Sequence, residues 1–395
     1  MSRPDVTVIG AGPAGMMASI VAARRGAKVL LAERNDRPGV KLSITGKGRC
    51  NLLNNCTLDE FILPPVRKDG GGDPRFFKSA LASFTPQDTM GFFEGLGVKL
   101  VTERGRRVFP ESGKASDIVN ALVRELDRLK VERRRERVAN LPEGKVIICT
   151  GGLSYPKTGS TCDGYTFAKQ AGHTILKPTP SLIPLESPDA FCAELSGLSL
   201  RNVTLSLRSP DGKTVFFEGP GEMLFTHFGI SGPMVLSASA HWLEGYSALI
   251  DLKPGLTEPM LDARILRDFQ KYSGKNILNA LVDLLHKSMI PVILLQAGIP
   301  GATKVASVTR EQRAALLQTL KAFSVRLSGT RPIEEAVVTR GGVSLKEVNP
   351  KTMESKLREG LFFAGEVLDL DGYTGGYNLQ IAWSTGAAAG RGCTA

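Results

Sequence analysis

The stretch Val6-Thr-Val-Ile-Gly10-Ala-Gly12-Pro-Ala-Gly15 near the amino terminus decides the fold. An apolar strand runs into three glycines spaced GxGxxG, and residues 16–25 behind them predict a helix. A second apolar strand, in Gly26-Ala-Lys-Val-Leu-Leu-Ala-Glu33, ends on an acid at the usual distance from the glycines. Strand, glycine turn, helix and strand with an acidic tip predict the first βαβ unit of a dinucleotide-binding domain.

Each residue of this fingerprint has a physical task. Gly10 permits a tight turn, Gly12 lets the backbone approach a pyrophosphate, and Gly15 lets helix and strand pack closely. The helix N-terminus offers free N–H groups and a positive dipole end to phosphates. Glu33 can accept hydrogen bonds from an adenosine ribose, and an acid at this position disfavours a 2′-phosphate. The alternative, a glycine turn in an ordinary core βα unit, leaves Glu33 unexplained.

Length and composition bound the class of protein. With 395 residues the chain exceeds one comfortable core, so we expect two or three domains. No apolar run reaches the roughly 18 residues that span a bilayer. Six cysteines form no CxxC pair and only four histidines exist, so we expect reduced thiols, a cytoplasmic location and no metal site.

The formal net charge of +11 suits a partner with many phosphates, or a dinucleotide with an anionic substrate. Much of this charge lies in Arg104, Arg106 and Arg107 and in the run Arg133-Arg-Arg-Glu-Arg137. Two interpretations of these clusters stay open: a solvated loop and helix end, or a nucleic-acid surface. No RNA-binding signature with interleaved aromatic residues accompanies them.

The pattern along the chain predicts an α/β, Rossmann-like domain built from both chain ends, over 1–182 and 341–395. From residue 183 the sequence pattern changes to alternating apolar and polar residues, which predicts an inserted β-rich domain over 183–257 with return strands at 322–340. A helical pattern predicts a helical subdomain at 258–321. The periodicity predicts helices at 76–84, 86–96, 116–130 and 379–390, strands at 99–102, 145–149, 203–208, 214–218, 223–226, 248–252, 322–327, 335–339 and 360–366, and a loop at 39–55.

Only one complete nucleotide fingerprint exists, whereas enzymes with two full dinucleotide domains should show two. One tight site and two further strand ends with glycines favour an extended FAD, whose AMP half would lie on Gly10–Gly15 and Glu33. Glu366 can accept hydrogen bonds from ribitol hydroxyls, and the Gly375-Gly376 turn can present N–H groups to flavin or pyrophosphate. The alternative for this turn is an ordinary helix entry.

Polar and reactive residues form two further candidate segments. Thr45-Gly-Lys-Gly-Arg49-Cys50-Asn51 is a poor core segment and suits a cofactor-facing loop. Arg49 can stabilise a reduced flavin or a substrate oxygen, and Cys50 is either a proton donor or a small buried residue packed on the flavin. His227, where a strand meets a glycine-proline turn, either faces the active cleft or is structural.

Three motifs resemble the BaiN/YhiN-like (RdsA-like) family of FAD-dependent oxidoreductases: Gly46-Lys-Gly-Arg-Cys-Asn51, Leu224-Phe-Thr-His-Phe-Gly-Ile-Ser-Gly-Pro233, and Gly365-Glu-Val-Leu-Asp369 followed by Gly372-Tyr-Thr-Gly-Gly-Tyr-Asn378. The resemblance runs end to end and implies an FAD domain, a β-barrel-like insert and a helical subdomain. It also implies FAD contacts at Gly10, Gly12, Pro13, Ala14, Gly15, Glu33, Arg34, Lys41, Gly48, Arg49, Cys50, Asn51, Val138, Thr150, Gly151, Gly365, Glu366, Gly376, Tyr377 and Asn378.

Two segments depart from the family pattern. Cys162 lies where the family usually has glycine, so the resemblance does not fix the conformation of that loop. The stretch 137–145 is short and omits a hairpin that many relatives carry.

The resemblance implies several activities: reduction of conjugated C=C bonds in bile-acid-like steroids, dihydrouridine synthesis in 23S ribosomal RNA, and oxidation of small aminoketones to give hydrogen peroxide. We expect an NAD(P)H-driven reductase that delivers hydride from flavin to an activated C=C, uridine in ribosomal RNA being one such acceptor. Arg49 would polarise the acceptor, and Cys50 or His227 would supply the proton. An oxidase is the alternative, and a flavin-bearing protein that binds RNA without catalysis is a third. Partners are a small-molecule substrate or ribosomal RNA, and neither DNA nor a membrane.

Overall fold

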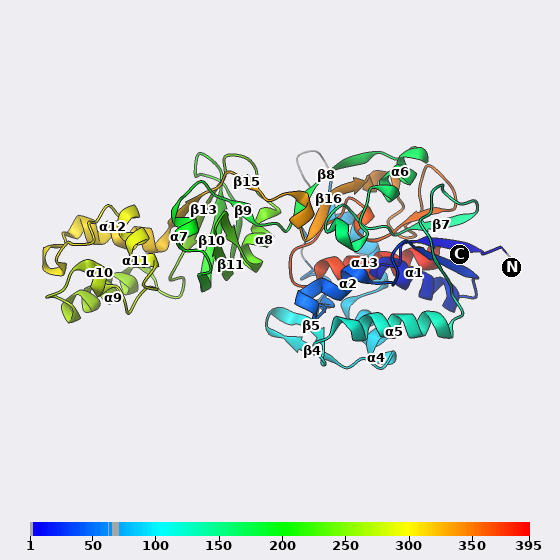
Figure 1. The fold of residues 1–395 in the computed structure, drawn as a ribbon, viewed down its shortest axis with the longest axis horizontal. Helices are drawn as coiled ribbons and strands as arrows, with labels where there is room; N and C mark the ends of the chain where they lie inside the picture. The colour runs from blue at the N-terminus through cyan, green and yellow to red at the C-terminus, as the bar shows by residue number, and fades with distance from the viewer. Residues whose placement is uncertain (1–2, 62, 65–70) are drawn as a thin grey trace. The chain divides into compact units, whose positions relative to one another are not determined.

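The computed structural model describes residues 3–61, 63–64 and 71–395. The chain folds into two compact units (Figure 1). The first joins Met1–Ser181 with Pro332–Ala395, and the second is the continuous segment Leu182–Arg331. The chain thus re-enters the first unit at Pro332, whereas the sequence pattern predicts return strands of the β-rich domain up to residue 340. The roles given to the domains stay predictions.

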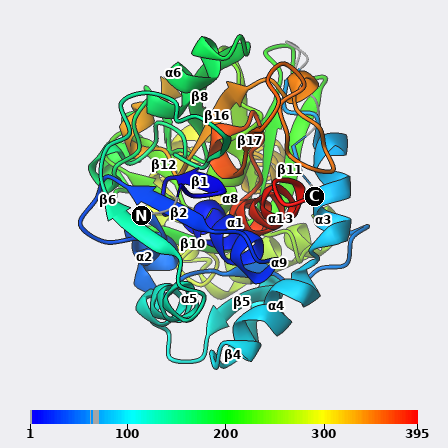
Figure 2. The ribbon, with the colours of Figure 1, turned by 90° about the vertical axis from the view of Figure 1, so that its right-hand side faces the viewer.

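Five parallel strands form the central sheet of the first unit, in the order β17-β7-β1-β2-β6. Figure 2 labels β17, β1, β2 and β6. β17, from the end of the chain, pairs with β7, so both chain ends build this sheet as the sequence predicts. The carboxyl ends of parallel strands lie at one edge, where such sheets bind nucleotides. The strands are β1 (Val6–Ile9), β2 (Val29–Glu33), β6 (Glu132–Arg135), β7 (Lys145–Ile148) and β17 (Leu361–Phe363).

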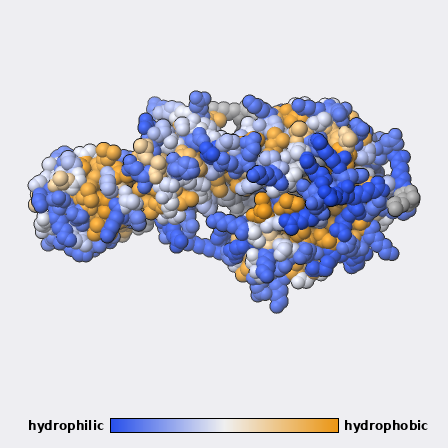
Figure 3. Space-filling model, viewed as in Figure 1, coloured by the Kyte–Doolittle hydropathy of each residue, from blue (hydrophilic) through white to orange (hydrophobic). Residues whose placement is uncertain are grey.

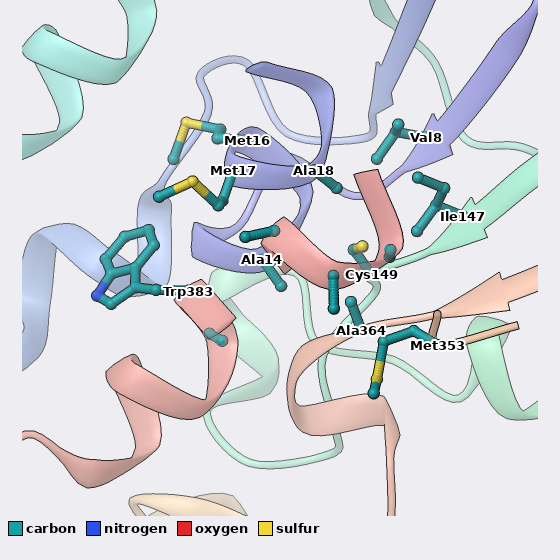
Figure 4. Packing of buried hydrophobic residues seen from close by; sticks show 14 of the residues in the cluster. Val8, Ala14, Met16, Met17, Ala18, Ile147, Cys149, Met353, Ala364 and Trp383 are labelled. Atoms are coloured by element: carbon teal, nitrogen blue, oxygen red, sulfur yellow. The ribbon is translucent and has the colours of Figure 1, made fainter. Parts of the chain in front are cut away.

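Helices α1 (Pro13–Arg24) and α13 (Tyr377–Gly392) pack against each other beside this sheet. A Cβ atom at Gly386 of α13 would lie 2.5 Å from the carbonyl oxygen of Ala14, so glycine permits the close approach. Helix α5 (Ala115–Arg128) is amphipathic and also contacts α1. The core around this crossing is apolar, and Figure 4 labels among its residues Val8, Met16, Met17, Ile147 and Trp383.

Smaller elements complete the first unit. A three-stranded antiparallel sheet has the order β3-β5-β4, and β8 pairs with β16 in a two-stranded sheet. The bounds are β3 (Leu53–Asn54), β4 (Leu100–Glu103), β5 (Arg107–Pro110), β8 (Ile175–Ser181), β16 (Val338–Val343), α2 (Val40–Ile44), α3 (Lys78–Ser83), α4 (Pro86–Gly95) and α6 (Asp163–Gln170).

Two of the predicted segments are wrong. The segment 39–55 is not a loop: α2, a 3₁₀ turn (Thr45–Gly48) and β3 lie in it, because Leu42, Leu52 and Leu53 are buried in the core. The strand predicted at 335–339 begins only at Val338 and pairs with β8 in the first unit. The structure of both segments depends on contacts with residues far away in the chain, which the local periodicity of the sequence does not reveal.

The second unit combines a seven-stranded antiparallel sheet with helices. The strand order is β14-β13-β10-β11-β12-β9-β15, and the Asp211-Gly212 turn joins β10 to β11 as predicted. The strands are β9 (Leu185–Glu186), β10 (Ser199–Arg208), β11 (Val215–Thr226), β12 (Gly229–Ser231), β13 (Ser247–Asp251), β14 (Phe323–Arg326) and β15 (Gly329–Thr330). The helices are α7 (Phe191–Glu194), α8 (Pro233–Ser239), α9 (Glu258–Lys271), α10 (Ile277–Ala280), α11 (Met289–Gln296) and α12 (Arg310–Lys321).

Hydrophilic side chains dominate the face of the molecule seen in Figure 3, interrupted by smaller hydrophobic patches. None of the described helices combines the length and the apolar composition that a membrane span requires. Within the residues that the structure describes, no group of three or more His, Cys, Asp or Glu side chains is arranged to hold a metal ion.

Candidate FAD site

The three fingerprint glycines have distinct surroundings at the end of β1. Gly10 has φ +101°, and a Cβ there would lie 2.5 Å from the carbonyl oxygen of Cys149. A Cβ at Gly15 would lie 1.8 Å from the carbonyl oxygen of Gly10. A Cβ at Gly12 would instead meet no described atom within 4 Å. Gly10 and Gly15 are therefore needed for packing, whereas Gly12 leaves open space at the start of α1.

Glu33 lies beside this turn at the tip of β2. The Ala11 N–H donates to Glu33 Oε2 at 2.7 Å, and the Asn35 N–H donates to Oε1 at 2.8 Å. Glu33 therefore holds the glycine turn in place. A carboxylate has about four lone-pair sites, so its oxygens can still accept from ribose hydroxyls.

A polar network surrounds Glu366, just beyond β17. Its carboxylate accepts from Lys41 Nζ at 2.7 Å, from Ser154 Oγ at 2.9 Å and from the Thr339 N–H at 2.8 Å. Lys41 Nζ also contacts Ser154 Oγ at 2.7 Å. The Leu153 and Ser154 N–H groups both donate to Thr339 Oγ1. This network joins α2, β16 and the loops after β7 and β17 at the carboxyl edge of the sheet.

A second helix begins at this edge without a side-chain cap. Gly376 precedes α13 with φ +102°, and no side chain caps its first turn. A Cβ at Gly376 would lie 2.2 Å from the carbonyl carbon of Leu53, so only glycine fits. Asn378 braces the turn, since its side chain accepts from the Gly372 N–H and donates to the Gly372 carbonyl, both at 2.8 Å. Like α1, whose start at Gly12 is also uncapped, α13 offers free N–H groups to an anion.

The residues of the 48–51 loop have different environments. Arg49 is exposed, pairs with Glu103, and holds its guanidinium carbon 4.2 Å from the centre of the Phe109 ring. Hydrogen bonding to Glu103 raises the pKa of Arg49. Cys50 is fully buried, and this burial raises the pKa of its thiol to about 12. The burial of Cys50 agrees with its interpretation as a packing residue, and its role as a proton donor stays a prediction.

Two buried polar atoms at sequence-predicted positions lack hydrogen-bond partners among the described residues. They are Asn51 Oδ1 and Thr150 Oγ1. A buried polar atom without a partner costs about 1–3 kcal/mol, so such atoms indicate a missing ligand group or water. Together with the open space at Gly12 and two uncapped helix starts, they fit FAD, which brings phosphates and many hydroxyls.

The remaining residues predicted to contact FAD also lie in the first unit. Gly151 (φ +74°) follows β7, and Gly365 (φ +77°) follows β17. A Cβ at Gly365 would lie 2.8 Å from the Ala14 Cβ, so α1 passes close to this turn. Arg34 is exposed and its Nη1 donates to Thr161 Oγ1 at 3.2 Å, while Val138 packs against the main core.

His227 is the predicted site residue that belongs to the second unit. It is exposed in the turn between β11 and β12, with its ring edge-on to Phe228. The other predicted residues all belong to the first unit. Sequence reasoning missed Thr339 and Asn54, because their contacts join strands far apart in the chain and leave no local pattern.

The backbone at Cys162, where relatives usually have glycine, has an ordinary conformation. Cys162 is exposed, unpaired and precedes α6 with φ −75°, a conformation open to any residue. The glycine expected there is not needed for this backbone.

The fold and this site define an FAD-dependent oxidoreductase, with a parallel nucleotide-binding sheet and two helix starts at its carboxyl edge. The chain belongs to the HI0933-like family, which confirms the family resemblance of its motifs. Residues 4–145 match the HI0933-like protein Rossmann domain, and residues 179–338 match the HI0933-like protein barrel and H2TH domain.

Three relatives align over nearly the whole chain. The ribosomal RNA dihydrouridine synthase of Escherichia coli (strain K12) is 33% identical, over 98% of this chain and 96% of its own length. The 3-dehydro-bile acid delta(4,6)-reductase of Clostridium scindens is 30% identical, over 98% of each chain. The ribosomal RNA dihydrouridine synthase of Haemophilus influenzae is 32% identical, over 96% of each chain.

Proposed function

We propose that this chain reduces the C=C bond of uridine in ribosomal RNA, with NAD(P)H as the electron source. The observation that carries the proposal is the end-to-end likeness to relatives whose names share one reaction type. Two are named for making dihydrouridine in ribosomal RNA and one for reducing a bile acid. In the proposed reaction the C=C bond gains a hydride and a proton, and NAD(P)H is oxidised to NAD(P)⁺.

FAD, when bound, supplies the two-electron relay between the nicotinamide and the substrate. The residues that hold it would be those of the carboxyl edge. The α1 start at Gly12 and the α13 start at Gly376 would receive the pyrophosphate and the flavin. Glu33 would hold the adenosine ribose, and Lys41 with Glu366 the ribitol hydroxyls. Asn51 and Thr150 would gain the partners that their buried oxygens lack.

Arg49 would orient the acceptor. Its guanidinium is exposed, remains charged at all working pH values and lies over the Phe109 ring. A cation beside the carbonyl conjugated with the C=C draws electron density away and makes the carbon a better hydride acceptor. Because Cys50 is buried, we assign it to packing. His227, which belongs to the second unit, stays the other proton donor that the sequence predicts.

Two observations favour RNA over a steroid as the substrate. The net charge of +11 suits a polyanion, and a steroid gives no reason for it. The two dihydrouridine synthases also align at 33% and 32% identity, against 30% for the bile acid reductase. The proposal implies a protein that works in the cytoplasm, where ribosomes are made.

Mass spectrometry of ribosomal RNA from a deletion strain tests the proposal. We expect dihydrouridine to be lost on deletion and restored when the purified holoenzyme and NADPH or NADH are added to that RNA. Unchanged dihydrouridine in the deletion strain contradicts the proposal. Rapid anaerobic bleaching of the flavin by a small aminoketone, followed by peroxide release in air, would instead support an oxidase.

A further inference from the structure

The arginines at the β6 edge have a structural explanation. An edge strand lined with charged side chains resists pairing with another chain. Each of these arginines also forms an ion pair with a carboxylate: Arg133 with Asp127, Arg134 with Glu132, Arg135 with Asp36 and Arg137 with Asp163. This cluster therefore presents little unbalanced charge to a partner.

The second group of cationic side chains has fewer carboxylates to neutralise its charge. We call it the hairpin arginine surface and define it as Lys47, Arg49, Arg104, Arg106 and Arg107, all exposed. Glu103 pairs with Arg49, and Glu60 pairs with Arg106. Within the described part of the chain, Lys47, Arg104 and Arg107 form no ion pair. The five cations of this surface thus face two paired carboxylates, Glu103 and Glu60, and Arg107 also attracts Glu103 without pairing with it.

The hairpin arginine surface is held in a defined shape. The Arg49 and Arg107 guanidinium carbons lie 4.2 and 6.0 Å from the centre of the Phe109 ring. Arg107 Nε donates to the Arg104 carbonyl at 3.1 Å, which fixes the turn of the hairpin. Ordered arginines lose less entropy on binding than free ones, so the surface is prepared for a ligand.

Hydrogen bonds of Asn54 connect this surface to the candidate FAD site. Asn54 Nδ2 donates to the Gly105 carbonyl at 3.0 Å and to the Gly375 carbonyl at 3.2 Å. One side chain therefore joins the tip of the β4–β5 hairpin to the glycine turn that begins α13. In Figure 2, β4 and β5 lie at the lower edge of the molecule, away from β1 and β2. The contacts of Asn54 are therefore the direct link between this hairpin and the candidate FAD site.

We infer that the hairpin arginine surface binds the phosphodiester backbone of a single-stranded RNA segment and so brings the target base to the site. Arginine forks suit phosphate oxygens. The RNA must be unpaired there, because an enzyme reaches a base only after it has left the stack. The identity of the polyanion rests on the proposed function, whereas the position of the surface rests on the charges and contacts above.

Fluorescence anisotropy on the oxidised holoenzyme tests this inference. The probe is a fluorescein-labelled, uridine-containing RNA of about 20 nucleotides, titrated across a salt series. The test variant is Lys47→Ser/Arg104→Ser/Arg107→Ser. The matched control, Arg133→Ser/Arg134→Ser/Arg135→Ser, removes the same charge from the β6 edge. Flavin absorbance verifies that each variant retains its cofactor.

We expect the test variant to bind RNA roughly 10- to 100-fold more weakly near 0.1 M salt, with a salt slope lower by about 2, since each lost phosphate contact removes about 0.7. The control should change less than about threefold. Equal losses in both variants, or unchanged binding by the test variant, overturn the inference. Preference of the native protein for anionic phosphatidylglycerol vesicles over RNA also overturns it.

The binding measurement needs no turnover, so it separates the inference from the proposed function. Weakened RNA binding in the test variant supports the surface even if the native enzyme makes no dihydrouridine. Dihydrouridine formation with unchanged RNA affinity in the test variant overturns the surface and leaves the proposed function in place.

Discussion

Lys41 and Glu366, separated by 325 positions in the chain, form an ion pair with 2.7 Å between Nζ and Oε2. The two side chains are 23% and 20% exposed, so the pair is partly buried. Ser154 contacts both, and the Thr339 N–H donates to the same carboxylate. This contact couples α2 to the return strand β17 at the edge where we propose the ribitol chain lies.

Lys41→Met should weaken FAD binding about tenfold, or about 1.4 kcal/mol. The substitution leaves the Glu366 carboxylate partly buried without its cation, which is unfavourable. Ser154 and the Thr339 N–H then remain as its donors, and the Lys41 ammonium group that we propose binds the ribitol hydroxyls of FAD is lost. Flavin fluorescence on dilution of the holoenzyme measures the dissociation constant. Lys169→Met, an exposed lysine on α6, is the control. Equal affinity in the two variants would show that the ion pair has no part in the site.

Alanine at the fingerprint glycines should separate packing from ligand binding. Gly15→Ala places a Cβ 1.8 Å from a carbonyl oxygen and should prevent folding. Gly12→Ala meets no described atom within 4 Å and should fold normally yet lose FAD affinity by tenfold or more, about 1.4 kcal/mol. Thermal unfolding and flavin titration measure the two effects.

Gly91→Ala is the matched control, since its Cβ also meets nothing within 4 Å and it lies inside α4. Alanine in a helix interior should raise stability by roughly 0.5–1 kcal/mol and leave FAD affinity unchanged. A Gly12→Ala variant that keeps full FAD affinity contradicts the pyrophosphate role of this position.

Local pattern was sufficient for the first βαβ unit, because Gly10 to Glu33 carry their signal within one supersecondary motif. The pairing of Lys41 with Glu366 was not predictable, since no periodicity links residues so far apart. Glycine content suggested a loop around Leu42, although burial of that one side chain orders a helix there. The partner of β8 likewise depends on the assembled core and not on neighbours in sequence. The burial of Cys50, in contrast, is one of the two interpretations that the sequence offers.

The buried thiol of Cys50 should make the protein less stable at alkaline pH. Burial raises its pKa from 9.0 to about 12, so the folded state keeps the proton where the unfolded chain releases it. The stabilising effect is complete below pH 9 and is lost as the pH rises through 12. Cys50→Ala should reduce the fall in unfolding free energy between pH 8 and 10 by about 1 kcal/mol.

Urea unfolding at the two pH values measures this difference. Cys162→Ala, at an exposed thiol, serves as the control and should leave the pH dependence unchanged. In the native protein, iodoacetamide should modify Cys162 and spare Cys50 until the chain unfolds. Rapid modification of Cys50 in the folded protein would restore it as a candidate proton donor.

Thr150→Val should raise the stability of the apoprotein and lower the affinity for FAD. The Thr150 Oγ1 is buried without a hydrogen bond among the described residues. Replacing it by a methyl group of the same shape should stabilise the apoprotein by about 1 kcal/mol. The same change should weaken FAD binding roughly fivefold, because the hydroxyl that we propose contacts the cofactor is gone.

Thr385→Val is the matched control for this prediction. The Thr385 hydroxyl accepts from the Gly365 N–H at 3.0 Å and donates to the Ile381 carbonyl at 2.6 Å. Its loss leaves a buried N–H unpaired and should destabilise the apoprotein by about 1–3 kcal/mol. Urea unfolding of both apoproteins measures the change in stability, and FAD titration then measures the change in affinity. If Thr150→Val destabilises the apoprotein as Thr385→Val does, or binds FAD with native affinity, then Thr150 does not face the cofactor.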